Sequence, residues 1–197
     1  MFQHEDEFPR PRVFILVSAL QKLRAYVKIC SVEINGLGVV KRFGSNFLIT
    51  DVFILSQQAS MISVKVDDLA LHKFIFEQVR NGGDPAEIKL QWHSHVNMEA
   101  YCSGEDRRTI SGYKSDFMIS LVMNKRDESF CRIDLFKPFR LGFAAPLEVF
   151  VPPDSELEDR CEEEIKEKVK IISGPDITSD LKELLENIES IEVRRTG

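Results

Sequence analysis

Apolar residues recur at two different periods along this chain, and the two periods predict alternating helices and strands. Over residues 18–30 the spacing is that of one helix face, carried by Leu20, Leu23, Val27 and Cys30. Residues 32–40 are instead rich in β-branched side chains and contain Gly36 and Gly38. This composition is typical of a strand that another backbone or a ligand approaches closely.

The same pattern continues through the middle of the chain. Further strands are expected at 47–55, 63–66, 88–95, 117–123, 130–136 and 147–151. A helix is expected over 69–80, capped by Asp67 or Asp68 and ended by a glycine pair, and a shorter helix is expected to begin near Ser103. Strands alternating with helices predict an α/β or α+β layered fold around a mixed sheet.

The tail after Pro153 changes character. Residues 154–169 are highly charged, with apolar positions four apart at Leu157, Cys161, Ile165 and Val169. A second amphipathic helix is expected around residues 181–191. The chain is therefore divided into an N-terminal arm over 1–12, a domain over 13–153 and C-terminal helices over 154–197. The apolar stripes favour packing on the domain, with partner binding as the alternative.

Composition narrows the classes of function. The 197 residues carry a net charge of -6, which argues against a nucleic-acid backbone as the main partner because phosphate binding needs a basic face. The longest apolar stretch, after Arg12, is too short to span a membrane and lacks the cleavage site of a secretory signal. We therefore expect a cytoplasmic protein with no membrane partner.

The run His93-Ser94-His95, followed by seven residues and then by Ser103 and Asp106, is the pattern with the clearest chemistry. Alternate side chains of a strand share a face, so the two imidazoles can hold one metal ion. A carboxylate from Asp106 and an open fourth position would complete the arrangement of a catalytic zinc site. Zinc lowers the pKa of a bound water from about 15.7 towards roughly 7.

Two further residues fit the same chemistry. Glu33 can accept a proton from the attacking water and pass it to the leaving amine. Ser103 can donate a hydrogen bond to the oxyanion of a tetrahedral intermediate. Ser103 and Asp106 also suit a plain helix N-terminus, and the two roles are compatible. Cys102 is read as a half-buried structural residue, with a nucleophilic role as the alternative.

Glu33, His93, His95, Ser103 and Asp106 together resemble the JAMM motif of MPN-domain metalloproteases (the JAB/MPN/Mov34 family). The resemblance covers about residues 13–151. It implies a three-layer α-β-α sandwich around a mixed sheet, followed here by the helical tail. It also implies one zinc ion per chain, with His93, His95 and Asp106 as ligands, Glu33 as acid/base and Ser103 as oxyanion donor.

The activity implied by the resemblance is hydrolysis of the peptide or isopeptide bond after the C-terminal glycine of ubiquitin or a ubiquitin-like protein. Two features depart from the family pattern: Val96 stands where many members have proline, and no flap insertion follows Asp106, as in compact prokaryotic-type members. Two alternatives remain open. One is a non-catalytic MPN scaffold, and the other is a zinc hydrolase of a carrier protein or small-molecule amide.

Overall fold

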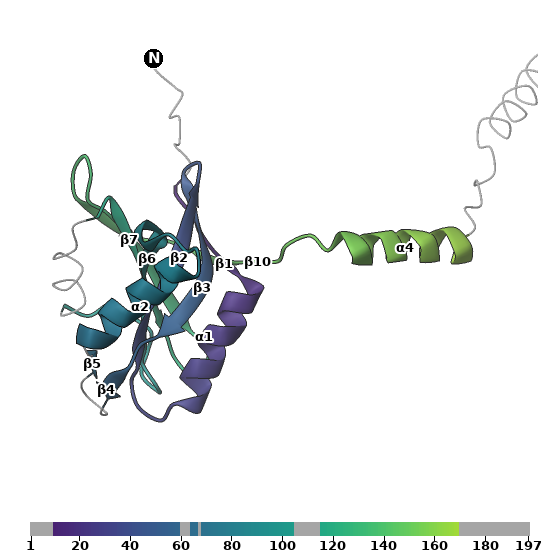
Figure 1. Ribbon diagram of the computed structural model, residues 1–197. Coiled ribbons are helices and arrows are strands. Elements are labelled where there is room, and N and C mark those ends of the chain that lie inside the picture. Colours follow the sequence, from purple (N-terminus) through teal and green to yellow (C-terminus); the bar gives the residue numbers. More distant parts are fainter. Residues whose placement is uncertain (1–9, 60–63, 67, 105–114, 170–197) are drawn as a thin grey trace, which may run out of the picture. The chain divides into compact units, whose positions relative to one another are not determined.

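The chain folds into two compact units, Met1–Pro152 and Pro153–Gly197. The structure, a computed structural model, describes residues 10–59, 64–66, 68–104 and 115–169. The first unit is a mixed α/β arrangement built on an eight-stranded sheet with both parallel and antiparallel pairs (Figure 1).

The large sheet has the strand order β10-β1-β3-β2-β6-β7-β8-β9. Its strands are β1 Val13–Leu16, β2 Asn35–Phe43, β3 Asn46–Ile54, β6 Ile88–Ser94, β7 Phe117–Met123, β8 Ser129–Leu135, β9 Leu141–Ala144 and β10 Leu147–Phe150. A small separate sheet pairs β4 Gln57–Ala59 with β5 Val64–Val66. The described helices are α1 Val17–Ile29, α2 Asp68–Arg80 and α4 Ser155–Lys168, with a single 3-10 turn at Pro85–Glu87.

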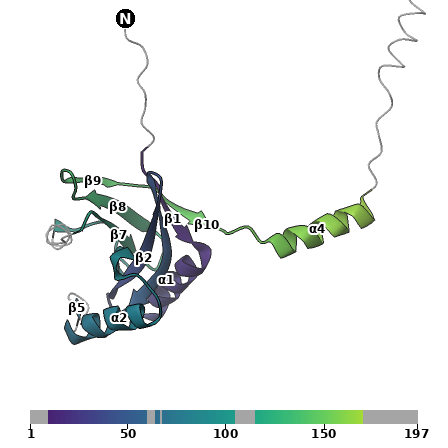
Figure 2. The same ribbon diagram turned by 45° about the horizontal axis from the view of Figure 1, so that its top comes forward.

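The large sheet is strongly curled. β9 and β10 stand at opposite ends of the strand order, yet only two residues join them. The first of these, Ala145, donates its backbone N–H to the carbonyl of Cys131 in β8 at 3.0 Å, and the second, Pro146, accepts from Val13 in β1 at 3.3 Å. A flat sheet could not satisfy both bonds, so its two ends bend towards each other (Figure 2).

The core lies between α1 and one face of this sheet. Helix α1 contributes Ala19, Leu20, Leu23 and Val27, all buried. Against them lies Trp92 of β6, which is fully buried and stacked on Tyr26 of α1, with ring centroids 5.9 Å apart. The Trp92 indole N–H lies 3.2 Å from two backbone carbonyls, those of Leu37 and Phe53, so its polar atom has acceptors although it is buried.

Helix α2 meets the sheet through a different aromatic pair. The ring of Phe74 lies 5.0 Å from the ring of Phe53 in β3. Phe53 pairs with Leu37 across the β2–β3 ladder, whereas its neighbour Val52 belongs to the core beneath α1. Side chains of adjacent strand residues point to opposite faces, so Phe53 and Val52 lie on opposite faces of the sheet.

Helix α4 belongs to the second unit. Asp154 caps its first turn by accepting a hydrogen bond from the Leu157 backbone at 3.0 Å. Lys166 pairs with Glu162 and Lys168 with Glu164, each one helical turn apart. No residue of α4 is buried, so local interactions of this kind stabilise the helix.

Most elements expected from the periodicity are confirmed. The strand expected at 32–40 begins three residues later, at Asn35, because residues 31–32 form a bend and residues 33–34 belong to no regular element. Three short strands were missed: β1, β4 and β9. The second tail helix, around residues 181–191, lies outside the described residues.

The helix expected near Ser103 is described only at its first position. Gly104 is helical, and the residues that follow lie outside the described part of the chain. None of the described helices is long and apolar enough to cross a membrane.

Candidate functional site

The two motif histidines lie side by side at the carboxyl end of β6. The Nε2 atoms of His93 and His95 are 3.1 Å apart. The intervening Ser94 is buried and points the other way, as expected for alternating strand positions. His95 is 5% exposed and His93 is half-buried, so the pair is sheltered from bulk water on one side.

The ring of His95 is held in one tautomer by its surroundings. Its Nδ1 lies 2.6 Å from the backbone carbonyl of Glu99. A carbonyl oxygen only accepts, so Nδ1 carries a proton, and in the neutral ring Nε2 then carries the lone pair that faces His93. This is the usual orienting bond of a metal-ligating histidine. A bound metal would take the Nε2 lone pairs of both rings.

The backbone next to Glu33 is bound to the residue between the two histidines. Ile34 donates its backbone N–H to Ser94 Oγ at 3.0 Å, and Ser94 donates its own backbone N–H to the Ile34 carbonyl at 2.8 Å. Both backbone groups of residue 34 are thus bound to the residue between the two histidines. Glu33 itself is half-buried and stands one residue before this double bond.

Asn35 is a residue of this site that the sequence did not reveal. It is the direct cross-strand partner of His93, so the two side chains share a face. Gln57 clamps its backbone by donating to the Asn35 carbonyl at 2.9 Å and accepting from the Asn35 N–H at 3.0 Å. The side-chain Oδ1 of Asn35 is buried and has no hydrogen-bond partner within the described chain. A buried acceptor beside a histidine suits a ring N–H donor.

The segment that follows the histidines brings Tyr101 onto the site. Its ring meets the ring of His95 edge-on, with centroids 4.9 Å apart, and its outer part is exposed. Ser103 follows two residues later and is half-buried. Asp106, the third expected ligand, lies outside the described residues. Among the residues that are described, no group of three His, Cys, Asp or Glu side chains could hold a metal ion.

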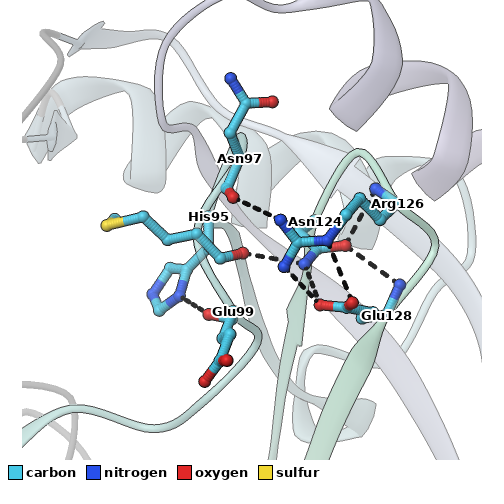
Figure 3. Close-up of polar contacts among 7 residues, drawn as sticks. His95, Asn97, Glu99, Asn124, Arg126 and Glu128 are labelled. Carbon is cyan, nitrogen blue, oxygen red and sulfur yellow. Dashed lines mark hydrogen bonds and ion pairs between the residues drawn. The ribbon is translucent and has the colours of Figure 1, made fainter.

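A hairpin supports the turn after His95 (Figure 3). The carbonyls of three successive turn residues are bound by three successive hairpin residues. Lys125 donates its backbone N–H to Val96 at 2.9 Å, Arg126 donates Nη1 to Asn97 at 2.7 Å and Asn124 donates Nδ2 to Met98 at 2.8 Å. The next carbonyl, that of Glu99, is the acceptor of the His95 proton.

The hairpin is itself braced by charge. Arg126 donates two hydrogen bonds to Glu128, at 3.0 and 2.8 Å. These bonds raise the pKa of Arg126. They also lower the pKa of Glu128, which additionally accepts from the Asn124 side chain at 2.6 Å. Asn124 is 1% exposed, and its Oδ1 accepts the backbone N–H groups of residues 126 and 128.

Val96 adopts an unusual backbone conformation. Its φ is +28°, a region that a β-branched residue rarely occupies. Proline is restricted to φ near −65° and could not take this conformation. The turn after the second histidine is therefore built differently here from a turn that contains proline.

The four cysteines differ in burial. Cys131 is buried, and burial raises the pKa of its thiol to about 12. Cys102 is half-buried and lies 3.8 Å from the Ser103 carbonyl. Cys30 is half-buried and Cys161 exposed.

Sequence reasoning named the two histidines and Glu33 but missed the residues that orient them. Asn35 and the hairpin residues Asn124, Arg126 and Glu128 are polar residues with no distinctive spacing from the motif. Tyr101 alone carried a local signal, because it lies within the motif between His95 and Ser103.

No known family profile and no curated protein sequence matches this chain. Its fold is similar to the solution structure of protein DSY2949 from Desulfitobacterium hafniense, a target of the Northeast Structural Genomics Consortium. The TM-score is 0.52 at 17% sequence identity, and the match covers 72% of this chain and 94% of the other. At that identity the similarity concerns the fold alone.

Proposed function

We propose that this chain is a zinc-dependent isopeptidase that cuts after the C-terminal glycine of ubiquitin or a ubiquitin-like protein. The observation that carries the proposal is the histidine pair. Two imidazole Nε2 atoms lie 3.1 Å apart, and one ring is fixed by a backbone carbonyl with its lone pair facing the other. The resemblance to the JAMM motif supplies the reaction and the class of substrate.

The spacing of the two nitrogens suits a shared metal ion. Two nitrogens bound to zinc at about 2.0–2.1 Å in a tetrahedral arrangement stand about 3.3 Å from each other. The observed 3.1 Å requires only a small adjustment. Asp106 is the proposed third ligand, contributed by the segment that follows Tyr101 and Ser103.

The fold offers further support. Helix α1 packs on the sheet face that carries Trp92, whereas Phe74 of α2 meets Phe53, whose side chain belongs to the other face. A helix on each face is what the three-layer α-β-α sandwich of the MPN domain requires. His93 shares the face of Phe53, because its register partner Asn35 and the next-but-one residue, Leu37, lie on that face.

Within this site each residue has one proposed task. The histidines and Asp106 hold the metal, which when bound supplies Lewis-acid activation of water near neutral pH. Glu33 takes the proton from the attacking water and delivers it to the leaving amine. Ser103 donates a hydrogen bond to the oxyanion that forms at the substrate carbonyl.

A second candidate is hydrolysis of a carrier-protein or small-molecule amide at the same site. It is favoured by the conformation of Val96, which gives the turn after His95 a shape that the proline of typical members cannot have. That turn borders the histidines, so its shape affects which substrate tail can lie beside them.

The metal site is tested by elemental analysis of the purified full chain. We expect about one zinc per chain in the wild type and none in Asp106→Ala. The control is Asp116→Ala, which removes an exposed carboxylate paired with Lys89 and should keep the metal. Absence of metal in the wild type, even after zinc is added, would refute the proposed enzyme and favour the non-catalytic scaffold.

The reaction is tested in the same preparations with ubiquitin-like proteins fused through their terminal glycine to a reporter. Glu33→Gln should retain zinc and lose about 100- to 10,000-fold in cleavage rate, the usual contribution of a general acid/base. Turnover of small amides without cleavage of any fusion would select the second candidate.

A further inference from the structure

The turn from His95 to Glu99 is bound to the hairpin through three of its five carbonyls. The carbonyl of His95 accepts from Met98 within the turn at 2.7 Å. Those of residues 96, 97 and 98 accept from Lys125, Arg126 and Asn124. The last, that of Glu99, is left for the His95 ring, at 2.6 Å. The acceptor that orients this histidine is thus fixed by residues from another part of the sequence.

We propose that the hairpin residues Asn124 and Arg126 are positioning residues for the metal-ligating His95. Their side chains hold the turn so that the Glu99 carbonyl keeps the ring proton on Nδ1 and the lone pair on Nε2. The inference rests on the proposed metal site for its functional meaning, but the tautomer it assigns is a property of the protein without metal.

Two observations distinguish this arrangement from an ordinary surface turn. First, Asn124 is 1% exposed although its side chain is polar. Its side-chain amide makes all of its hydrogen bonds to the hairpin and the turn. Second, Val96 holds φ +28° at the start of the turn, a strained conformation that persists only where the surroundings enforce it. The hairpin provides that enforcement, since Lys125 binds the Val96 carbonyl.

The side chains contribute bonds that a generic hairpin would not. Arg126 reaches Asn97 with Nη1 while its Nε and Nη2 bind Glu128, so the planar guanidinium is held at both ends. A lysine has no such fork and could not reproduce these fixed directions. Removing a residue that orients a metal ligand typically lowers metal affinity by about 10- to 100-fold.

The test uses the full-length chain free of metal. Long-range proton–nitrogen correlation spectra show which ring nitrogen of each histidine carries the proton, and the His95 signal is assigned by its loss in His95→Gln. In the wild type we expect His95 protonated at Nδ1 alone. In Arg126→Ala, and in Asn124→Asp, which keeps the Oδ1 acceptor but loses the Nδ2 donor, we expect a mixture of both tautomers.

Zinc affinity, measured by competition with a chelating dye, should fall about 10- to 100-fold in the same two variants. The matched control is Asp127→Asn. Asp127 lies in the same hairpin and pairs with Arg24 of α1 at 3.1 Å, but its side chain has no described bond to the turn. Asparagine also tolerates its φ of +63°. This control should match the wild type in tautomer and affinity.

An unchanged His95 tautomer in both variants would overturn the inference. So would an equal change in Asp127→Asn, because the effect would then be general loosening of the hairpin. If the wild type binds no zinc but His95 still shows mixed tautomers in the two variants, the proposed enzyme is refuted and the positioning role stands. Arg126 is about half-exposed, so its replacement by alanine is compatible with folding.

Discussion

Gly36 and Gly38 let the β2 backbone lie directly against large neighbours in the centre of the sheet. A Cβ atom on Gly36 would stand 2.0 Å from the Phe53 carbonyl oxygen and 2.6 Å from the Trp92 indole. At Gly38 the nearest atoms would be the Asp51 carbonyl and a Leu90 methyl group, both at 2.6 Å. The Trp92 ring therefore occupies space that only a residue without a side chain leaves open.

Replacing Gly36 with alanine should lower the free energy of unfolding by about 1–3 kcal/mol. The physical reason is that the added methyl group meets a backbone oxygen, which cannot rotate away as a side chain could. Urea denaturation followed by Trp92 fluorescence measures the effect. Gly104→Ala is the control, because a Cβ there meets nothing within 4 Å; equal stability of the two variants would contradict the packing described.

At the scale of elements, the β7–β8 hairpin is both a part of the sheet and a support for the neighbouring turn. Its two strands pair in unbroken register from Phe117 with Leu135 to Met123 with Ser129. The connecting residues turn back through the buried Asn124 and the αL conformation of Asp127. Asp127 also ties the hairpin to α1 through Arg24 and Lys28.

The charge pair of this hairpin predicts its response to acid. Glu128 has a lowered pKa because it accepts hydrogen bonds from Arg126 and Asn124. Because the pKa of Glu128 is lower in the folded protein than in the unfolded chain, the pair stabilises the hairpin at pH values above the unfolded pKa. This stabilisation is lost as the pH falls through the folded pKa. In a carbon-detected titration, Glu128 should therefore titrate below the ordinary range of glutamate. In Arg126→Ala its pKa should rise, and an unchanged midpoint would show that Arg126 is not the cause.

At the scale of the whole molecule, every residue of the central apolar core lies before Pro152. The last strand, β10, is nonetheless essential to the sheet, because it pairs in parallel with the full length of β1. The second unit begins at Pro153. Its described helix, α4, is stabilised by its cap and by ion pairs one turn apart.

A chain ending at Pro152 should keep the cooperative unfolding of the sheet unit. We expect its melting temperature to stay within about 2–4 °C of that of the full chain, the shift that about 1 kcal/mol produces in a domain of this size. Differential scanning calorimetry measures it. A chain ending at Pro146, which lacks β10, is the control and should unfold at a clearly lower temperature. An equal fall in melting temperature in both truncated chains would mean that the tail stabilises the sheet.

The amino-acid sequence by itself determined the types and approximate bounds of most elements, because helical and strand periods are local properties of the chain. It also placed His93 and His95 on one face, since a period of two requires it. The sequence pattern did not predict the short strands β1 and β9. β1 runs into α1 without a break, and β9 contains Gly142, which interrupts the alternation of side chains. A side chain at Gly142 would stand 2.0 Å from the Arg132 guanidinium.

Only the tertiary structure decided which distant residues meet. Ile34, the neighbour of Glu33, binds Ser94 across 60 positions of sequence. Asn35 faces His93 because β2 and β6 adopt one register, and the hairpin at Asn124 reaches the turn after His95 because β6 and β7 are neighbours. Strand order and register depend on how all strands share one core, which no local pattern encodes. The paired histidines could therefore be recognised from the sequence, whereas the residues that orient them were decided by the fold.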